Sequence, residues 1–105
     1  MTSNRIGSIR SILLIRIGGI KVRVHEITIA SDFQPQYLQM VVQKASYFSS
    51  DIRIKFEKEN IQLDAKSILG MMLLPIRQGT KIIIQTKGSD EEEAIEVMSS
   101  LLEKH

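Results

Sequence analysis

Few side chains in this chain of 105 residues have the chemical type and spacing that a reaction centre requires. There is no cysteine, which excludes disulfides and thiolate chemistry. The two histidines, His25 and His105, lie near opposite ends of the sequence and supply no cluster of metal ligands. No glycine-rich phosphate loop and no Ser-His-Asp constellation can be assembled. The sequence therefore predicts neither a metal site nor a cofactor.

An acidic run at residues 90–93 is explained better by a helix than by a cation site. Ser89 or Asp90 can cap a helix that begins here, and the three glutamates that follow complement the positive end of the helix dipole. His25 lies in a β-prone segment with the parity of Ile27, so we expect a structural role for it.

The hydroxyl group of Ser67 lies in a sequence context that indicates a possible function. Ser67 follows Lys66 and opens a short apolar segment that ends before Pro75. A serine at such a position caps a short helix, and it can also accept a phosphoryl group close to free backbone N–H groups and a basic side chain. The spacing alone favours the cap.

The elements that must position Ser67 are visible in the periodicity of the apolar residues. Strands are predicted at residues 22–29, 52–57, 61–65 and 80–86. Helices are predicted at residues 35–48, at residues 67–74, and from about residue 90 onward. The stripe expected to be buried in the last helix is Ala94, Val97, Met98, Leu101 and Leu102. The order β-α-β-β-α-β-α, with one-sided strands and amphipathic helices, predicts an α+β fold with helices on one face of an antiparallel sheet.

Basic residues concentrate in an N-terminal extension. Residues 1–21 contain four basic and no acidic residues, whereas residues 22–105 contain ten basic and twelve acidic ones. The apolar run at residues 11–20 is interrupted by Arg16 and Gly18-Gly19, is too short to span a bilayer and has no signal-peptide cleavage site. We therefore expect a cytoplasmic protein that binds neither nucleic acid nor membrane. Residues 22–105 are expected to form its domain, and residues 1–21 an extension that is disordered or adds a strand.

Four motifs follow one another along the expected domain. They are residues 42–48 (VQKASYF), 65–72 (AKSILGMM), 78–82 (QGTKI) and 88–94 (GSDEEEA). Together with the order of strands and helices, these segments resemble the HPr family, the small phosphocarrier proteins of the bacterial sugar phosphotransferase system. The resemblance implies the open-faced β-sandwich of that family, with a four-stranded antiparallel sheet and three helices on one face.

The first of two phosphorylation sites implied by this resemblance is not matched. The family carries its phosphocarrier histidine in Gly-Leu-His-Ala-Arg-Pro, at the start of the first helix. A gapless alignment places Gln34 at the histidine position and Gln36 at the arginine position, whereas a shift that matches Pro35 to the family's proline places Asp32 at the histidine position. Residues 27–52 contain neither histidine nor arginine, and a glutamine amide cannot carry a labile phosphoryl group. We therefore expect no phosphotransferase relay and no catalytic residue.

The second implied site is matched by Ser67. In Gram-positive members of the family, a serine at the start of the second helix is phosphorylated by HPr kinase/phosphorylase. A lost histidine beside a kept serine is similar to the catabolite-repression subgroup (the Crh type), whose phosphorylated form binds a LacI-family regulator, the catabolite control protein. The resemblance thus implies a non-catalytic regulatory protein of sugar transport and carbon catabolite repression.

The resemblance also implies a docking face for these partners. It consists of the start of the first helix and the exposed positions around the second, namely Gln34, Gln36, Lys66, Ile68, Leu69 and Met72. Met71 and Leu73 are expected in the core. Gln36 departs from the arginine that the subgroup keeps, so the binding of the usual regulator is an open question.

Two alternatives to this function remain open. The chain can be an interaction protein that uses the HPr fold without phosphorylation, or a divergent phosphotransferase-system component with another nucleophile. A monomer and a dimer formed by exchange of the first strand are both compatible with the sequence.

Overall fold

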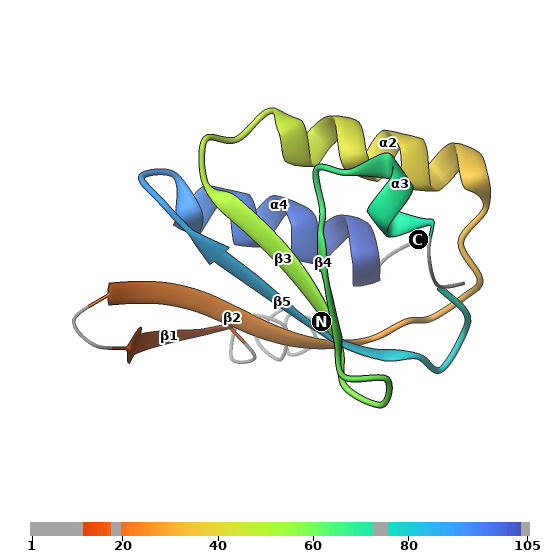
Figure 1. Ribbon diagram of the computed structural model, residues 1–105, viewed down its shortest axis with the longest axis horizontal. Helices are drawn as coiled ribbons and strands as arrows, with labels where there is room; N and C mark the ends of the chain where they lie inside the picture. Colours follow the sequence, from red (N-terminus) through yellow and green to blue (C-terminus); the bar gives the residue numbers. More distant parts are fainter. Residues whose placement is uncertain (1–11, 18–19, 73–75, 104–105) are drawn as a thin grey trace, which may run out of the picture.

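Strands with one buried and one exposed face form the scaffold of the molecule. The computed structural model describes residues 12–17, 20–72 and 76–103, and side chains from Val22 onward. All strand pairs are antiparallel, and the spatial order is β1-β2-β5-β3-β4 (Figure 1). The strands are β1 (Ile12–Ile17), β2 (Ile20–Thr28), β3 (Asp51–Phe56), β4 (Ile61–Asp64) and β5 (Lys81–Lys87).

The last strand of the sequence lies at the centre of the sheet. β5 pairs with β2 on one side, where Ile82 faces Ile27, and with β3 on the other, where Ile84 faces Ile54. These four side chains are buried and, because residues directly opposite each other share a face, they all point to the same side of the sheet.

Three helices cover that side of the sheet (Figure 1). They are α2 (Pro35–Ser46), α3 (Ile68–Met71) and α4 (Glu91–Glu103). α4 packs against β2, β5 and β3, while α2 packs against α3 and α4. The largest side chains in the core between the layers include Ile27, Ile54, Phe56, Met71, Ile84 and Met98. Within the described ranges, no helix is long and apolar enough to cross a membrane.

The α+β fold predicted from the sequence is confirmed. β2, β5, β3 and β4 form the four-stranded antiparallel sheet, and the three helices lie on one face of it. β1 adds a fifth strand at the edge, with Ile12 opposite His25 and Ile17 opposite Ile20. The structure therefore contains a strand within the expected N-terminal extension, and β2 begins two residues earlier than predicted. α3 is a single turn rather than two, and Leu73 and Pro75 lie outside the described residues.

The buried stripe of α4 differs from the predicted one. The structure buries Ala94, Ile95, Met98, Ser99 and Leu102. Val97 and Leu101, which were expected in the core, are only partly buried and pack against its margin. The prediction missed the buried face because Ser99 lies within it, and a polar residue there weakens the apolar pattern of that face.

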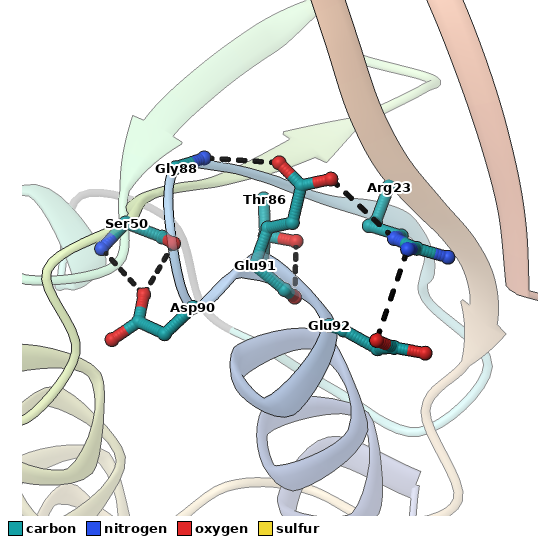
Figure 2. Close-up of polar contacts among 7 residues, drawn as sticks. All are labelled: Arg23, Ser50, Thr86, Gly88, Asp90, Glu91 and Glu92. Carbon is teal, nitrogen blue, oxygen red and sulfur yellow. Dashed lines mark hydrogen bonds and ion pairs between the residues drawn. The ribbon is translucent and has the colours of Figure 1, made fainter.

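The start of α4 is tied to the connection between α2 and β3 through Asp90 (Figure 2). Its carboxylate accepts hydrogen bonds from the backbone N–H groups of Ser49 and Ser50, both at 2.9 Å, and from the Ser50 hydroxyl. These bonds, with the Ser50 hydroxyl first, hold the pKa of the Asp90 carboxyl below its ordinary value. The sequence predicts Ser89 or Asp90 as the cap of this helix, whereas the described hydrogen bonds of the Asp90 carboxylate are made to the loop between α2 and β3.

A second contact at the same place constrains Gly88. Glu91 accepts the Gly88 N–H at 3.1 Å, and its other carboxylate oxygen lies 3.4 Å from Nε of Arg23 on β2 (Figure 2). Gly88 has φ +151°, and a Cβ atom there would lie 2.6 Å from Oγ and 2.7 Å from Cα of Ser50. Only glycine fits this dihedral angle and this approach of two backbones.

Candidate functional site

Ser67 is the residue immediately before α3, and its hydroxyl oxygen accepts a hydrogen bond from the backbone of this helix. Its backbone is extended, with φ −108° and ψ 112°, and Oγ accepts a hydrogen bond from the N–H of Gly70 at 3.1 Å. A Cβ atom at Gly70 would lie 3.3 Å from this Oγ, so little space separates the hydroxyl from the backbone of the turn. The residue is half-buried. The cap predicted from the sequence is therefore formed, and it sets the position at which any phosphoryl group would be attached.

Lys66 is turned toward the fold. Its ammonium group donates a hydrogen bond to the carbonyl oxygen of Phe48 at 2.7 Å, and its backbone N–H donates to Oδ1 of Asp64 at 2.9 Å. The first bond joins the segment before α3 to the end of α2. Lys66 thus fixes the backbone next to Ser67, and its ammonium group binds the Phe48 carbonyl.

The exposed apolar side chains of this region lie in and directly after α3. Leu69 is 80% exposed and Met72 is 57% exposed, whereas Ile68 is half-buried. Met71 is fully buried, as expected, because a helix of one turn must direct one side chain into the core. Large apolar side chains left in water beside a polar surface are typical of a protein-binding site.

The start of α2 lies next to this apolar surface, but it carries no nucleophile. Gln34 is exposed and precedes the helix, its side chain forms no capping hydrogen bond, and Pro35 occupies the first helical position. Proline has no backbone N–H, so one of the free donors that normally mark a helix start is missing here. Gln36 is also exposed. Neither Gln34, Pro35 nor Gln36 can serve as an acid, a base or a phosphoryl acceptor.

A hollow of about 290 Å³ joins the two halves of the predicted docking face. Gln34 and Pro35 line it from the start of α2, and Met72 lines it from the end of α3. Its other walls are Asp32, Phe33, Leu38, Ile76 and Arg77. Arg77 was not predicted from the sequence, because it lies 43 residues from Gln34 and no local motif links the two.

Backbone contacts between two loops hold Arg77 beside this hollow. The N–H of Phe33 donates to the carbonyl of Ile76 at 2.9 Å, and the N–H of Gln78 donates to Oδ1 of Asp32 at 2.8 Å. Ile76 is only 3% exposed and anchors the segment in the core. The contacts lie on both sides of Arg77, so its backbone is fixed while its side chain is exposed.

His25 is buried on the helix-covered side of β2. It is 1% exposed, and its Nε2 lies 3.1 Å from Oε2 of Glu103 in the last turn of α4. This contact joins the end of α4 to the sheet. His105 lies outside the described residues. Within the described part of the chain, no three His, Asp or Glu side chains are grouped so that they could hold a metal ion.

The capping role of Ser67 makes a measurable prediction. Ser67→Ala should lower the free energy of unfolding by about 1 kcal/mol, because the Gly70 N–H loses its acceptor, whereas Ser67→Asn should change it little. Urea unfolding followed by circular dichroism measures both. Ser46→Ala is the matched control, since Ser46 is exposed and only donates to the carbonyl of Val42 within α2. Equal stability of Ser67→Ala and Ser46→Ala would contradict the cap.

Comparison with known proteins identifies relatives of this chain. A family model described as "PTS HPr component phosphorylation site" matches residues 23–104. The HPr-like protein Crh of Halalkalibacterium halodurans is 38% identical over 79 residues, which is 75% of this chain and 92% of the relative. The phosphocarrier protein HPr of Bacillus anthracis superimposes with a TM-score of 0.72 at 32% identity, covering 78% of this chain and 98% of its own.

A third comparison concerns assembly. The crystal structure of Crh from Bacillus subtilis superimposes with a TM-score of 0.60 at 30% identity, covering 72% of this chain and 83% of its own. That protein is described as an intertwined dimer with a swapped domain. In this chain, β1 lies before the region that the family model matches, so the fifth strand is an addition to the matched domain.

Proposed function

This chain belongs to the HPr family, and from that membership we propose that it is a non-catalytic regulatory protein switched by phosphorylation of Ser67. The proposed enzyme is an HPr kinase/phosphorylase. The proposed partner of the phosphorylated form is a LacI-family catabolite control protein, and the proposed setting is carbon catabolite regulation in the cytoplasm.

The observation that carries the proposal is the environment of Ser67. A phosphoryl ester on Oγ would stay within reach of the Gly70 N–H, which already donates to that oxygen. The new negative charge would lie at the start of α3, two residues before the exposed Leu69 and five before the exposed Met72. Phosphorylation would therefore add charge to an exposed apolar surface without breaking the contacts that position it, which is the property required of a docking switch.

The start of α2 supports a role without phosphoryl relay. Gln34 offers an amide in place of an imidazole, Pro35 removes a backbone donor, and Gln36 offers no positive charge. Each of these three residues removes something that a phosphohistidine site needs. The same surface remains exposed and borders the hollow shared with Met72, so it is free to take part in docking.

The proposal is tested by incubating the chain with HPr kinase/phosphorylase and ATP and measuring the intact mass. Wild type should gain one phosphoryl group, Ser67→Asn should gain none, and Ser46→Ala should behave as wild type. Ser67→Asn is preferred to Ser67→Ala because asparagine keeps the helix cap. No phosphoryl gain in wild type, or a gain that survives in Ser67→Asn, would show that the proposal is wrong.

Binding experiments separate this function from its alternatives. A regulator that binds the phosphorylated chain and not the unmodified chain supports the switch. A partner that binds wild type and Ser67→Asn equally supports an interaction protein that works without phosphorylation. Sedimentation distinguishes a monomer from a strand-exchanged dimer, in which β2 would take β1 with it because the two strands pair along six residues.

A further inference from the structure

Arg77 is an exposed cation that lines the hollow at the start of α2. It shares the hollow with Gln34 and Met72, although it comes from the loop before β5 rather than from α2. The chain has lost positive charge at Gln36, two residues beyond Gln34. The loop that carries Arg77 is connected to the segment before α2 by one backbone hydrogen bond, from Phe33 to Ile76, and by one from the Gln78 N–H to the Asp32 carboxylate, so this placement is a fixed feature of the fold.

Glu57 and Glu59 line a second hollow together with Arg77, but neither forms a described ion pair with its guanidinium. Among the described residues, Arg77 forms no ion pair, and its only described hydrogen bonds use its backbone: its N–H donates to Oγ1 of Thr80 at 3.3 Å and its carbonyl accepts from the N–H of Thr80 at 3.0 Å. Asp32 is the acidic group in the hollow at the start of α2, and its Oδ1 accepts the N–H of Gln78. The ammonium of Lys66 is committed to Phe48 within the fold.

We propose that Arg77 supplies the positive charge of the docking face, by binding a carboxylate of the partner protein at the hollow beside Gln34 and Met72. This inference rests on the proposed function. A guanidinium can bind a carboxylate through two parallel hydrogen bonds, which gives direction as well as attraction. The exposed side chain of Met72, which lines the same hollow, is suited to an apolar contact beside that pair. The partner surface is thus an acidic side chain flanked by apolar ones, and arginine beside apolar residues is a frequent arrangement at the energetic centre of an interface.

The test uses the full chain phosphorylated at Ser67, with its mass verified, and a purified LacI-family catabolite control protein as the probe. Titration calorimetry at several salt concentrations measures the affinity. Arg77→Gln should weaken binding about tenfold or more, because a charge-assisted pair is lost. Arg77→Lys should restore only part of the affinity, since lysine keeps the charge without the planar fork. The affinity of wild type should also fall more steeply with salt than that of Arg77→Gln.

Arg53→Gln is the matched control, because it removes the same charge from a half-exposed arginine on β3 that is paired with Asp51 of its own strand. It should change the affinity by less than about twofold.

A second variant tests whether an arginine at position 36 can replace the arginine at position 77. Gln36→Arg added to Arg77→Gln should recover part of the lost affinity.

The outcomes separate the two proposals. If phosphorylated wild type binds the regulator and Arg77→Gln binds within twofold of it, the role of Arg77 is wrong while the proposed function stands. If phosphorylated wild type does not bind the regulator, both are wrong. If Arg53→Gln weakens binding as much as Arg77→Gln, the effect comes from net charge and the assignment to Arg77 is overturned.

Discussion

Phosphoryl transfer from phosphoenolpyruvate, through the first enzyme of the phosphotransferase system, is expected only after three neighbouring residues at the start of α2 are changed. Gln34→His supplies an imidazole nitrogen that can carry a phosphoryl group. Pro35→Ala restores a backbone N–H at the first helical position, and Gln36→Arg supplies a guanidinium for the phosphoryl oxygens. Wild type should accept no phosphate at this site.

The size of the effect follows from the number of contacts that each change adds. Gln34→His alone provides the nucleophile with no donor to stabilise the transferred group. Each added donor is expected to raise the rate about tenfold or more, because a hydrogen bond to a charged group is worth about 1.5–3 kcal/mol. Transfer of radiolabel from phosphoenolpyruvate measures the rate, and the acid lability of phosphohistidine distinguishes it from phosphate on Ser67.

The control for this experiment replaces only the nucleophile. A variant with Gln34→Asn, Pro35→Ala and Gln36→Arg has the same donors and no imidazole, so it should stay inactive. Label on the unmodified chain in an acid-labile form would show that the chain is a relay after all. A triple variant that remains inactive would show that the site has lost more than these three residues.

Gly88→Ala is expected to cause the largest loss of stability of any single methyl addition at the glycines that the structure describes. The methyl group would lie 2.7 Å from the backbone Cα of Ser50, and the dihedral angle φ +151° is unfavourable for alanine. Overpacking and dihedral strain each cost about 1–3 kcal/mol, so the free energy of unfolding should fall by about 2–6 kcal/mol. For a domain whose total stability is about 5–15 kcal/mol, this is a large fraction.

Gly79→Ala separates the two causes. Gly79 also has a positive φ, +87°, but nothing lies within 4 Å of a Cβ atom placed there. It should therefore lose only the dihedral part, about 1–2 kcal/mol. Urea unfolding of both variants gives the comparison, and thermal melting followed by circular dichroism covers the case in which Gly88→Ala is only partly folded. Equal losses at the two glycines would mean that the contact with Ser50 relaxes without cost.

The sequence predicts the elements well where one periodicity dominates. β3 alternates between apolar and charged residues, and the structure buries Ile52, Ile54 and Phe56 as expected. The prediction was less successful in α4, where Ser99 occupies a buried position and Val97 does not. Tertiary packing decides which face of α4 is buried, and no local pattern contains that information when a polar residue lies within the buried stripe.

In the candidate site, too, residues with local roles were predicted from the sequence, and residues placed by tertiary contacts were not. Ser67 was found from the sequence because its role is local: it caps the turn formed by the three residues that follow it. Arg77 was not found because its place beside Gln34 depends on hydrogen bonds between two loops distant in the sequence. The contact of Asp90 with Ser50 is of the same kind, and it too became visible only in the folded structure.

The central position of β5 determines when this domain can fold during its synthesis. The β1–β2 and β3–β4 hairpins are each made of neighbouring segments and can form soon after they leave the ribosome. Neither hairpin pairs with the other, because both are joined only through residues 81–87 near the end of the chain. The sheet can therefore be completed only after residues 81–87 have been synthesised. Until then the nascent chain presents two incomplete sheets whose inner edges are unpaired, and those edges are the surfaces that a chaperone would have to protect.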